Sequence, residues 1–178
     1  MTKTAYHHGD LRRVLLDAAL GLIAERGPAA ISLRDLARAA GVSHAAPAHH
    51  FGDKAGLFTA IAVQGNELLA DALAGADLKE MGVRYVRFAA EYPSHFEVMF
   101  RPDLCHADDP DLAAARARTS EALRRGVPAG GDKVVLAAWS LAHGFATLRR
   151  SGNLDHLLGD RDAGEAFGEI AGLLRVRG

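Results

Sequence analysis

The 178-residue chain has one cysteine, Cys105, and no long apolar run. A single cysteine excludes an internal disulfide, and no stretch approaches the roughly 20 apolar residues that cross a bilayer. The first residues also lack the hydrophobic region of a secretion signal. We therefore expect a cytoplasmic protein without a membrane partner.

Strand-forming residues are sparse, and aromatic residues make up only 6% of the chain. Residues that favour helices, such as Ala, Leu, Arg and Glu, are abundant. The hydrophobic content of 49% and the charged content of 24% are ordinary for a globular protein. The composition predicts an all-α fold.

Catalytic and metal-binding signatures are also missing. Nine histidines and many carboxylates could serve hydrolysis, but no His-Glu-x-x-His, nucleophile elbow or glycine-rich phosphate loop occurs. Cys105 and His106 stand near Asp108 and Asp109 at a spacing that fits no tetrahedral metal site. We predict no enzyme, no metal and no cofactor, with hydrolysis kept as an alternative.

What the sequence does contain is a helix, a tight turn and a second helix within residues 32–58. Ser32 can cap the first helix in a capping box with Asp35. Gly41 can end that helix in the left-handed conformation, and Ser43 can cap the second. This is the pattern of a helix-turn-helix, whose second helix enters the DNA major groove. A helical hairpin packed for its own sake would give the same pattern.

The second helix carries short and polar side chains. Small side chains let the backbone approach base edges, and His can donate to a phosphate or a base acceptor. Pro47 falls just past the first turn if Ser43 is the cap, so we expect a short helix with an irregular first turn. The residues expected to face DNA here are Ser43, His44, Ala45, Ala46, Pro47, His49 and His50.

A further helix is expected to begin at Lys54. Asp53 can cap it, and Lys54 then lies near a positive helix N-terminus, where a phosphate is favoured. Ser32 and Arg34 are two further candidates for contacts with the DNA backbone. Residues 2–9 form a polar arm, for which a frayed terminus and a backbone contact both stay open.

The formal charge of −1 is divided unevenly along the chain. Residues 1–60 hold seven Lys and Arg against five Asp and Glu, a balance of +2, with five His besides. The remainder holds 14 against 17, a balance of −3. The asymmetry has the sign expected for a DNA-binding N-terminal part, and such binding depends on salt.

Helical spacing accounts for most of the remaining chain. It predicts a first helix that Gly27 and Pro28 end, and a long helix from Lys54 that ends at 75–77. Further helices are expected from 78 to Pro93, over 111–127, from Asp132 as the cap to about 150, and over 162–176. Residues 101–110 predict a surface loop, and 128–131 a turn.

The first third of the chain carries a combined pattern without gaps: Glu-Arg-Gly at 25–27, Ile-Ser-Leu-Arg-Asp-Leu-Ala at 31–37, Gly-Val-Ser at 41–43 and His-His-Phe-Gly-Asp-Lys-Ala-Gly-Leu-Phe at 49–58. This pattern resembles the N-terminal domain of TetR-type transcriptional regulators. The resemblance implies a three-helix DNA-binding domain over 1–58, a reading unit at about 32–51, and a phosphate contact by Lys54. Many members have an aromatic residue where this chain has Ala48, so a tyrosine contact to phosphate is absent.

The remainder of the chain contains Trp-Ser-Leu-Ala-His-Gly-Phe-Ala-Thr-Leu at 139–148. It is similar to the Trp-His-Gly signature of one C-terminal domain type among TetR-like regulators, as are 6–12, 85–89 and 95–100. The resemblance implies that 59–178 form a helical bundle that binds a ligand and dimerises through the last two long helices. A two-fold dimer would require a near-palindromic operator.

Aromatic and methionine side chains at helical spacing could line a cavity for a small apolar effector, or fill an ordinary core. Trp139 and His143 lie four residues apart on one helix face and are expected to act together. His143 is either a ligand contact or a buried, hydrogen-bonded residue. The candidate ligand-binding residues are Tyr85, Phe88, Phe96, Met99, Phe100, Trp139 and His143.

Together these observations predict a ligand-responsive transcriptional regulator, a repressor that binds a double-stranded DNA operator as a homodimer. The alternative is a helical small-molecule binding protein or adaptor that does not recognise a DNA sequence. That alternative explains the C-terminal part but leaves the pattern of residues 32–58 without a role.

Overall fold

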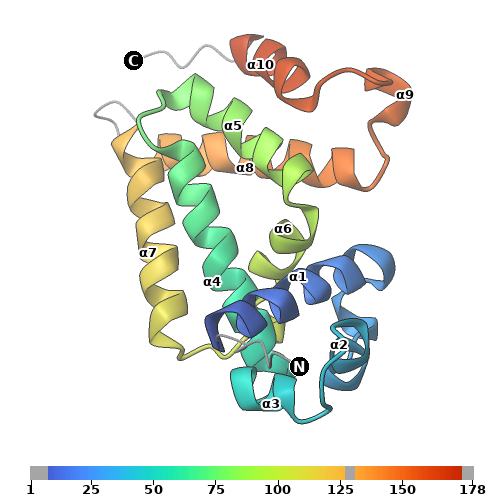
Figure 1. The fold of residues 1–178 in the computed structure, drawn as a ribbon. Helices are drawn as coiled ribbons and strands as arrows, with labels where there is room; N and C mark the ends of the chain where they lie inside the picture. The colour runs from blue at the N-terminus through green and yellow to red at the C-terminus, as the bar shows by residue number, and fades with distance from the viewer. Residues whose placement is uncertain (1–7, 127–130, 174–178) are drawn as a thin grey trace. The chain divides into compact units, whose positions relative to one another are not determined.

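The computed structural model describes residues 8–126 and 131–173, with side chains from residue 11 onward. Over these ranges the ordered elements are all helices, which confirms the all-α prediction (Figure 1). In chain order they are α1 (His8–Arg26), the 3₁₀ helix η1 (Pro28–Ala30), α2 (Leu33–Ala39), α3 (Ala46–Phe51), α4 (Lys54–Leu73), α5 (Leu78–Glu91), α6 (Pro93–Met99), the 3₁₀ helix η2 (Pro102–Leu104), α7 (Pro110–Arg125), α8 (Asp132–Arg150), α9 (Asp155–Leu158) and α10 (Ala163–Leu173).

The chain divides into two compact units. The head unit comprises the chain through Gln64 together with Ser94–Leu112, and the body unit comprises Gly65–Pro93 together with the chain from Ala113. All three points where the chain passes from one unit to the other lie inside helices, in α4, α6 and α7. The predicted boundary at residue 58 separates a DNA-binding part from a ligand-binding and dimerising part of the chain. It does not describe the two compact units, and it stays a prediction.

The head unit has a core built around α1. Leu15, Ala19 and Ile23 recur at helical spacing on this helix and are fully buried. Val98 and Leu112 belong to the same core, and the Ser94 hydroxyl donates to the Leu20 carbonyl at 2.9 Å. Burying one such side chain stabilises a fold by roughly 1.5–3 kcal/mol. The segment 94–112 is therefore a structural part of the head unit, which the sequence did not indicate.

The body unit is organised around α5, which packs against both α8 and α10 (Figure 1). Asp77 caps α5 by accepting from the Glu80 amide at 2.9 Å. The apolar face of this helix is buried, and the rings of Phe145 and Phe167 meet edge to face at 5.5 Å between α8 and α10. Within the described ranges, no helix combines the length and apolar character that a membrane span requires.

The start of α8 corrects one prediction. Asp132 was expected to cap this helix, but Gly131 is the N-cap, without a side-chain hydrogen bond, and Asp132 is the first helical residue. The Asp132 carboxylate lies 3.9 Å from the Arg124 guanidinium instead. A carboxylate in the first turn is also favoured by the helix dipole, so the residue type alone did not decide between the two positions.

Other differences concern short or terminal segments. The four-residue helix α9 was not predicted, and η2 interrupts the expected loop over 101–110. The arm residues Lys3 and His7 lie outside the described residues, and His8 begins α1. The expected turn at 128–130 and the expected end of the last helix at 174–176 also lie outside the described ranges.

Candidate DNA-binding surface and ligand site

The first helix of the predicted reading unit is held by a complete capping box. The Ser32 hydroxyl accepts from the Asp35 amide at 3.2 Å, and the Asp35 carboxylate accepts from the Ser32 amide at 3.2 Å and from its hydroxyl at 2.5 Å. These bonds satisfy amides that the helix leaves free, and the bond from Ser32 lowers the pKa of the Asp35 carboxyl. The predicted capping box is confirmed.

The turn after α2 is a Schellman motif. Gly41 takes φ +66°, and its amide donates to the Arg38 carbonyl at 3.2 Å. The Val42 amide donates to the Ala37 carbonyl at 3.0 Å. This pair of bonds defines the motif, and the left-handed glycine makes it possible. The predicted glycine turn is therefore confirmed, and it fixes the direction in which the chain leaves α2.

The start of α3 differs from the prediction. The helix begins at Ala46, with Ala45 as an N-cap that has no side-chain hydrogen bond, so the predicted cap at Ser43 is wrong. Pro47 explains the difference, because in the first turn of a helix its missing N–H costs no hydrogen bond. In a helix capped by Ser43, Pro47 would lie beyond the first turn, where its missing N–H would cost a hydrogen bond. The expected short helix is confirmed.

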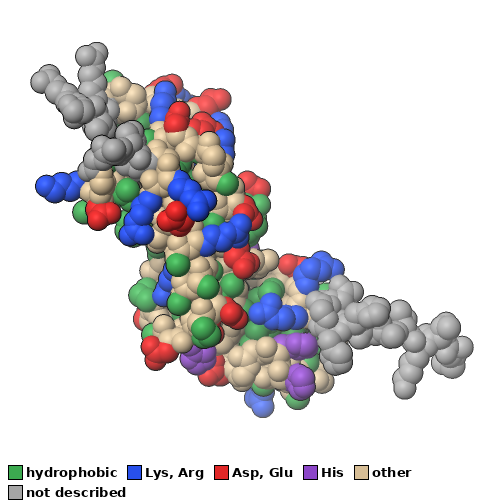
Figure 2. Space-filling model, turned by 90° about the vertical axis from the view of Figure 1, so that its left-hand side faces the viewer, with side chains coloured by type: hydrophobic (Ala, Val, Ile, Leu, Met, Phe, Trp, Pro, Cys, Tyr) green, Lys and Arg blue, Asp and Glu red, His purple; other side chains and the backbone are tan. Residues whose placement is uncertain are grey.

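The exposed surface of this region contains most of the residues predicted to meet DNA. Ser32 and Arg34 on α2 are exposed, whereas Pro47 is buried and Ala46 and His50 are half-buried. In the face shown in Figure 2, cationic and anionic side chains are interspersed over the surface. The exposed residues from the turn through α3 are Ser43, His44, Ala45, Ala48 and His49.

A γ-turn joins α3 to α4. Phe51 is nearly buried, and the next residue, Gly52, takes φ +76° and ψ −69°. The Asp53 amide donates back to the Phe51 carbonyl at 2.9 Å, which closes the turn. Asp53 then caps α4 by accepting from the Gly56 amide at 2.7 Å, and this bond is the main cause of the lowered pKa of its carboxyl. The predicted cap at Asp53 is confirmed.

Lys54, the first residue of α4, is held by its own unit. Its ammonium donates to the Ala29 carbonyl of η1 at 3.0 Å and lies 5.5 Å from the centre of the Phe58 ring. A lysine ammonium has three donors, so the bond to Ala29 leaves donors for an incoming anion. The backbone carbonyl and the ring keep the charge beside the start of α4.

A contact that the sequence did not indicate joins the loop after α6 to the same place. The His106 ring lies 3.0 Å from the Asp53 carboxylate, through Nε2 and Oδ1. The His106 amide donates to the Thr59 hydroxyl at 2.9 Å, and that hydroxyl donates to the Ala55 carbonyl at 2.8 Å. We call these contacts the His106 latch. They connect the 101–109 loop to the first two turns of α4.

In the body unit, three of the predicted ligand residues form a hydrogen-bonded cluster. The Trp139 indole donates to the Tyr85 hydroxyl at 3.2 Å, and that hydroxyl lies 2.8 Å from His143 Nδ1. A neutral tyrosine hydroxyl that accepts the indole proton can still donate to Nδ1 of a neutral His143 or accept from it, as the tautomer of His143 decides. Burial raises the pKa of Tyr85 and lowers that of His143, which favours these neutral forms.

The other predicted ligand residues are divided between the units. Phe88 is buried in the body unit, where its ring stacks on Tyr92 at 5.2 Å. Phe96, Met99 and Phe100 belong to the head unit, and the rings of Phe96 and Phe100 meet at 4.9 Å. The structure therefore gathers Tyr85, Trp139 and His143, and a role of the others in ligand binding stays a prediction.

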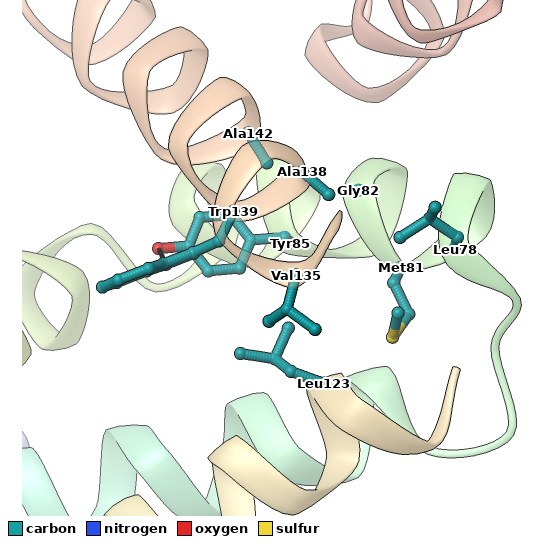
Figure 3. Close-up of a pocket in the computed structure, with 9 residues that line it drawn as sticks. All are labelled: Leu78, Met81, Gly82, Tyr85, Leu123, Val135, Ala138, Trp139 and Ala142. Atoms are coloured by element: carbon teal, nitrogen blue, oxygen red, sulfur yellow. Dashed lines mark hydrogen bonds between the residues drawn. The ribbon is translucent and has the colours of Figure 1, made fainter. Parts of the chain in front are cut away.

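Two cavities lie beside this cluster. The smaller has a volume of about 20 Å³, and Tyr85 and Trp139 form one side of it, opposite Met81 and near Leu123 (Figure 3). Such a volume holds about one water molecule. A larger cavity of about 440 Å³ lies between α5, α8 and α10. Across the described chain, no group of three His, Cys, Asp or Glu side chains could hold a metal ion.

Comparisons with known proteins agree with this geometry. Residues 15–61 match the family model described as "Bacterial regulatory proteins, tetR family". Residues 78–170 match the model described as "Tetracyclin repressor-like, C-terminal domain". The first match covers α2, α3 and the start of α4, and the second covers the elements from α5 to most of α10.

Among curated proteins, the HTH-type transcriptional repressor Rv3405c of Mycobacterium tuberculosis is 36% identical over 78 residues. That match spans 44% of this chain and 33% of the relative. A solved Rhodococcus sp. RHA1 protein of unknown function is 30% identical, with a TM-score of 0.72 and 96% of both chains covered.

The TetR family transcriptional regulator PfmR from Thermus thermophilus is 27% identical, with a TM-score of 0.66. The similarity covers 90% of this chain and 96% of PfmR. Two family models together cover most of the chain, and solved relatives share its fold over nearly their whole length. The chain belongs to the TetR family of bacterial transcriptional regulators.

Proposed function

We propose that this regulator is a ligand-responsive repressor that binds a near-palindromic operator as a homodimer in the bacterial cytoplasm. The observation that carries the proposal is the rigid frame of α2, α3 and the start of α4. A capping box, a Schellman turn and a γ-turn fix this frame, and it presents short polar side chains to solvent.

DNA binding would divide into positioning and reading. Lys54, Ser32 and Arg34 would contact backbone phosphates, which set the register of the protein on the duplex. The exposed side chains of His44 and His49 offer hydrogen-bond donors toward base edges, and Ala45 offers a methyl group that fits a thymine methyl. The absence of an aromatic side chain at Ala48 leaves this part of the surface to the histidines.

The apolar surface of the last helices supports a homodimer. Leu136 and Leu148 of α8 are 60% and 47% exposed, and Leu173 of α10 is 81% exposed. Large apolar side chains exposed on the same pair of helices are typical of a protein interface. A two-fold interface there would present two copies of α3 to successive major grooves.

Ligand response would arise in the body unit. From Trp139, His143 and Gly144 we assign the C-terminal domain of the chain to the Trp-His-Gly type. An effector can weaken operator binding only if it binds two states of the protein with different affinity. Replacement of Trp139 is expected to change the effector response or the stability of the dimer. Wild-type behaviour in both measurements would remove Trp139 from the mechanism.

The test of DNA recognition is the selection of bound sequences from a random duplex library, followed by a salt titration on the selected duplex. Enrichment of a near-palindrome, with an affinity that falls steeply as salt rises, would support the proposal. A variant that keeps the frame but removes two reading side chains, His44→Ala with His49→Ala, should lose the enrichment. No enrichment at low salt would overturn sequence recognition and favour a small-molecule binding protein.

A further inference from the structure

The cavity between α5, α8 and α10, the larger of the two described above, combines an apolar wall with two cationic side chains. Its volume of about 440 Å³ lies within the range of small-molecule sites. The wall is formed by small or apolar side chains from three helices, and Lys79 of α5 and Lys133 of α8 complete the lining. The main wall residues are Gly82, Val134, Ala138, Leu141, Phe167 and Ala171.

The two lysines differ from the arginines around them. In the body unit, Arg84, Arg87 and Arg118 are each paired with a carboxylate, of Glu80, Asp162 and Asp71 respectively. Lys79 and Lys133 are exposed, and neither forms an ion pair or a side-chain hydrogen bond with any residue that the structure describes. Two cations that pair with no carboxylate of the described residues thus border one apolar cavity.

The neighbouring cavity cannot hold the same kind of ligand. It measures about 20 Å³, and the bond between Trp139 and Tyr85 lies along one side of it (Figure 3). The two cavities share Leu78, Gly82 and Ala138 as lining residues. A molecule in the larger cavity would therefore press on the wall of the smaller one, three residues along α5 from Tyr85.

We propose that the larger cavity binds an amphipathic anion, an aliphatic carboxylate whose chain lies against the apolar wall and whose carboxylate meets Lys79 and Lys133. The aliphatic chain gains by leaving water, and the carboxylate accepts charge-assisted hydrogen bonds from the two ammonium groups. A neutral amphiphile lacks the second interaction, and a cationic one is repelled. The proposal names the effector class of the proposed repressor. Only the consequence of binding, which is the release of DNA, rests on the proposed function.

The experiment measures binding to the purified full-length protein by isothermal titration calorimetry, without DNA. The probes are decanoate, decanol and decyltrimethylammonium, each kept below the concentration at which it forms micelles. We expect decanoate to bind at least tenfold more tightly than the other two. We also expect its affinity to fall as salt rises, since exposed charges are screened.

Two variants and a matched control assign the site. Lys79→Gln with Lys133→Gln should weaken decanoate binding at least tenfold and leave decanol unchanged, whereas Arg116→Gln on α7 removes a cation outside the cavity and should change neither. Ala171→Phe fills the cavity and should weaken all three probes. Circular dichroism and the thermal midpoint show whether each variant folds.

Equal binding of the three probes, or decanoate binding that is unchanged in the double lysine variant, would overturn the proposal. Absence of binding, together with chemical cross-links between lysines of two copies at this cavity, would also overturn it, because a second copy would then cover the site. DNA release is measured separately. Decanoate binding without release would contradict the effector role and leave the binding site intact.

Discussion

Different kinds of contact hold the helix-turn-helix region of the head unit and the polar cluster of the body unit. In the head unit, the positions of α2, α3 and the start of α4 are fixed by bonds between residues two to five positions apart, such as Ser32 with Asp35 and Phe51 with Asp53. In the body unit, the polar cluster joins Tyr85 to His143, 58 positions away, and α5 is enclosed by helices from the far end of the chain. The caps and turns around α3 are specified locally, whereas the polar cluster of the body unit depends on long-range packing.

The two kinds of contact determine where the structure tolerates change. Short caps and turns leave few alternative backbone paths, as suits a surface that must match the geometry of DNA. Packing between helices that are distant in sequence can leave empty volume between them, and the body unit contains a cavity of about 440 Å³. We infer that changes in the head unit act through backbone geometry, and that changes in the body unit act through cavities and buried polar groups.

The largest effect is expected from Gly56→Ala at the start of α4. A Cβ at this position would lie 2.0 Å from the Phe51 carbonyl oxygen, a backbone atom that cannot move without opening the γ-turn. We expect the free energy of unfolding to fall by about 3 kcal/mol, measured by urea denaturation. Gly21→Ala is the matched control, because its Cβ meets nothing within 4 Å and should stabilise α1 by about 0.8 kcal/mol. Equal effects would refute the steric explanation.

Tyr85→Phe tests the long-range contacts of the body unit. The change removes the acceptor of the Trp139 indole and the partner of His143 while it keeps the ring. We expect a loss of about 1–2 kcal/mol in the free energy of unfolding, because the indole and the imidazole each lose one hydrogen bond. Tyr92→Phe is the control, since Tyr92 follows the same helix and is more exposed. A smaller loss for Tyr85→Phe than for the control would contradict the importance of the cluster.

Lys54→Ala tests the phosphate contact proposed for the head unit. Its charge lies beside the start of α4, so its loss should weaken binding to every DNA sequence by about tenfold. The slope of log affinity against log salt should fall by about one. Fluorescence anisotropy over a salt series measures both quantities. A changed base preference with unaltered non-specific affinity would assign Lys54 to reading instead.

The pH dependence of stability compares one histidine from each unit, the buried His95 and the half-buried His143. Burial lowers the pKa of His95 in the head unit, although Asp17 raises it in part, and burial also lowers the pKa of His143 in the body unit. In the unfolded chain both titrate near pH 6.5. Below that pH the unfolded state binds more protons than the folded state, so the free energy of unfolding should fall as pH falls.

Urea midpoints at pH 7.5 and pH 5.5 measure this loss. His143→Gln and His95→Gln should each make the loss smaller, whereas replacement of the exposed His49 should leave it unchanged. An identical loss in all three variants would show that neither His95 nor His143 is its source.

The smallest effect is expected from His106→Ala. The His106 latch holds the 101–109 loop to Asp53 and Thr59 at the start of α4, but both side chains of the His106–Asp53 contact are exposed to solvent. We expect about a twofold loss in DNA affinity with little change in global stability, since exposed ion pairs contribute little. His106→Asn keeps a hydrogen-bond donor and serves as the control. A loss as large as that of Lys54→Ala would make the latch part of the DNA contact itself.

Sequence patterns predicted the local features of both units. The capping box of Ser32, the turn at Gly41 and the cap at Asp53 each follow from residue types a few positions apart, and all three are present. The pairing of Trp139 with His143 was also expected, because residues four apart share a helix face. The predicted roles of these residues in DNA and ligand binding remain to be tested.

The features that sequence patterns missed depend on distant or competing contacts. The contacts of Tyr85 with His143 and of His106 with Asp53 each join residues more than 50 positions apart, and no local pattern encodes them. Ser43 failed as a cap because Pro47 determined the start of α3. When two local preferences favour different helix starts, the stronger preference decides. Residue spacing alone does not show which one is stronger.

The three passages of the chain between the units have a consequence for engineering hybrid regulators. A chimaera joined once, after the reading helices, would take its operator specificity from one parent. It would still take residues 94–112, a piece of the head unit's core, from the other parent. Compatible hybrids would need three junctions, each inside a helix and each keeping the helical register. If α3 reads the operator as proposed, new specificities are more easily grafted as side chains on this helix than exchanged as a whole module.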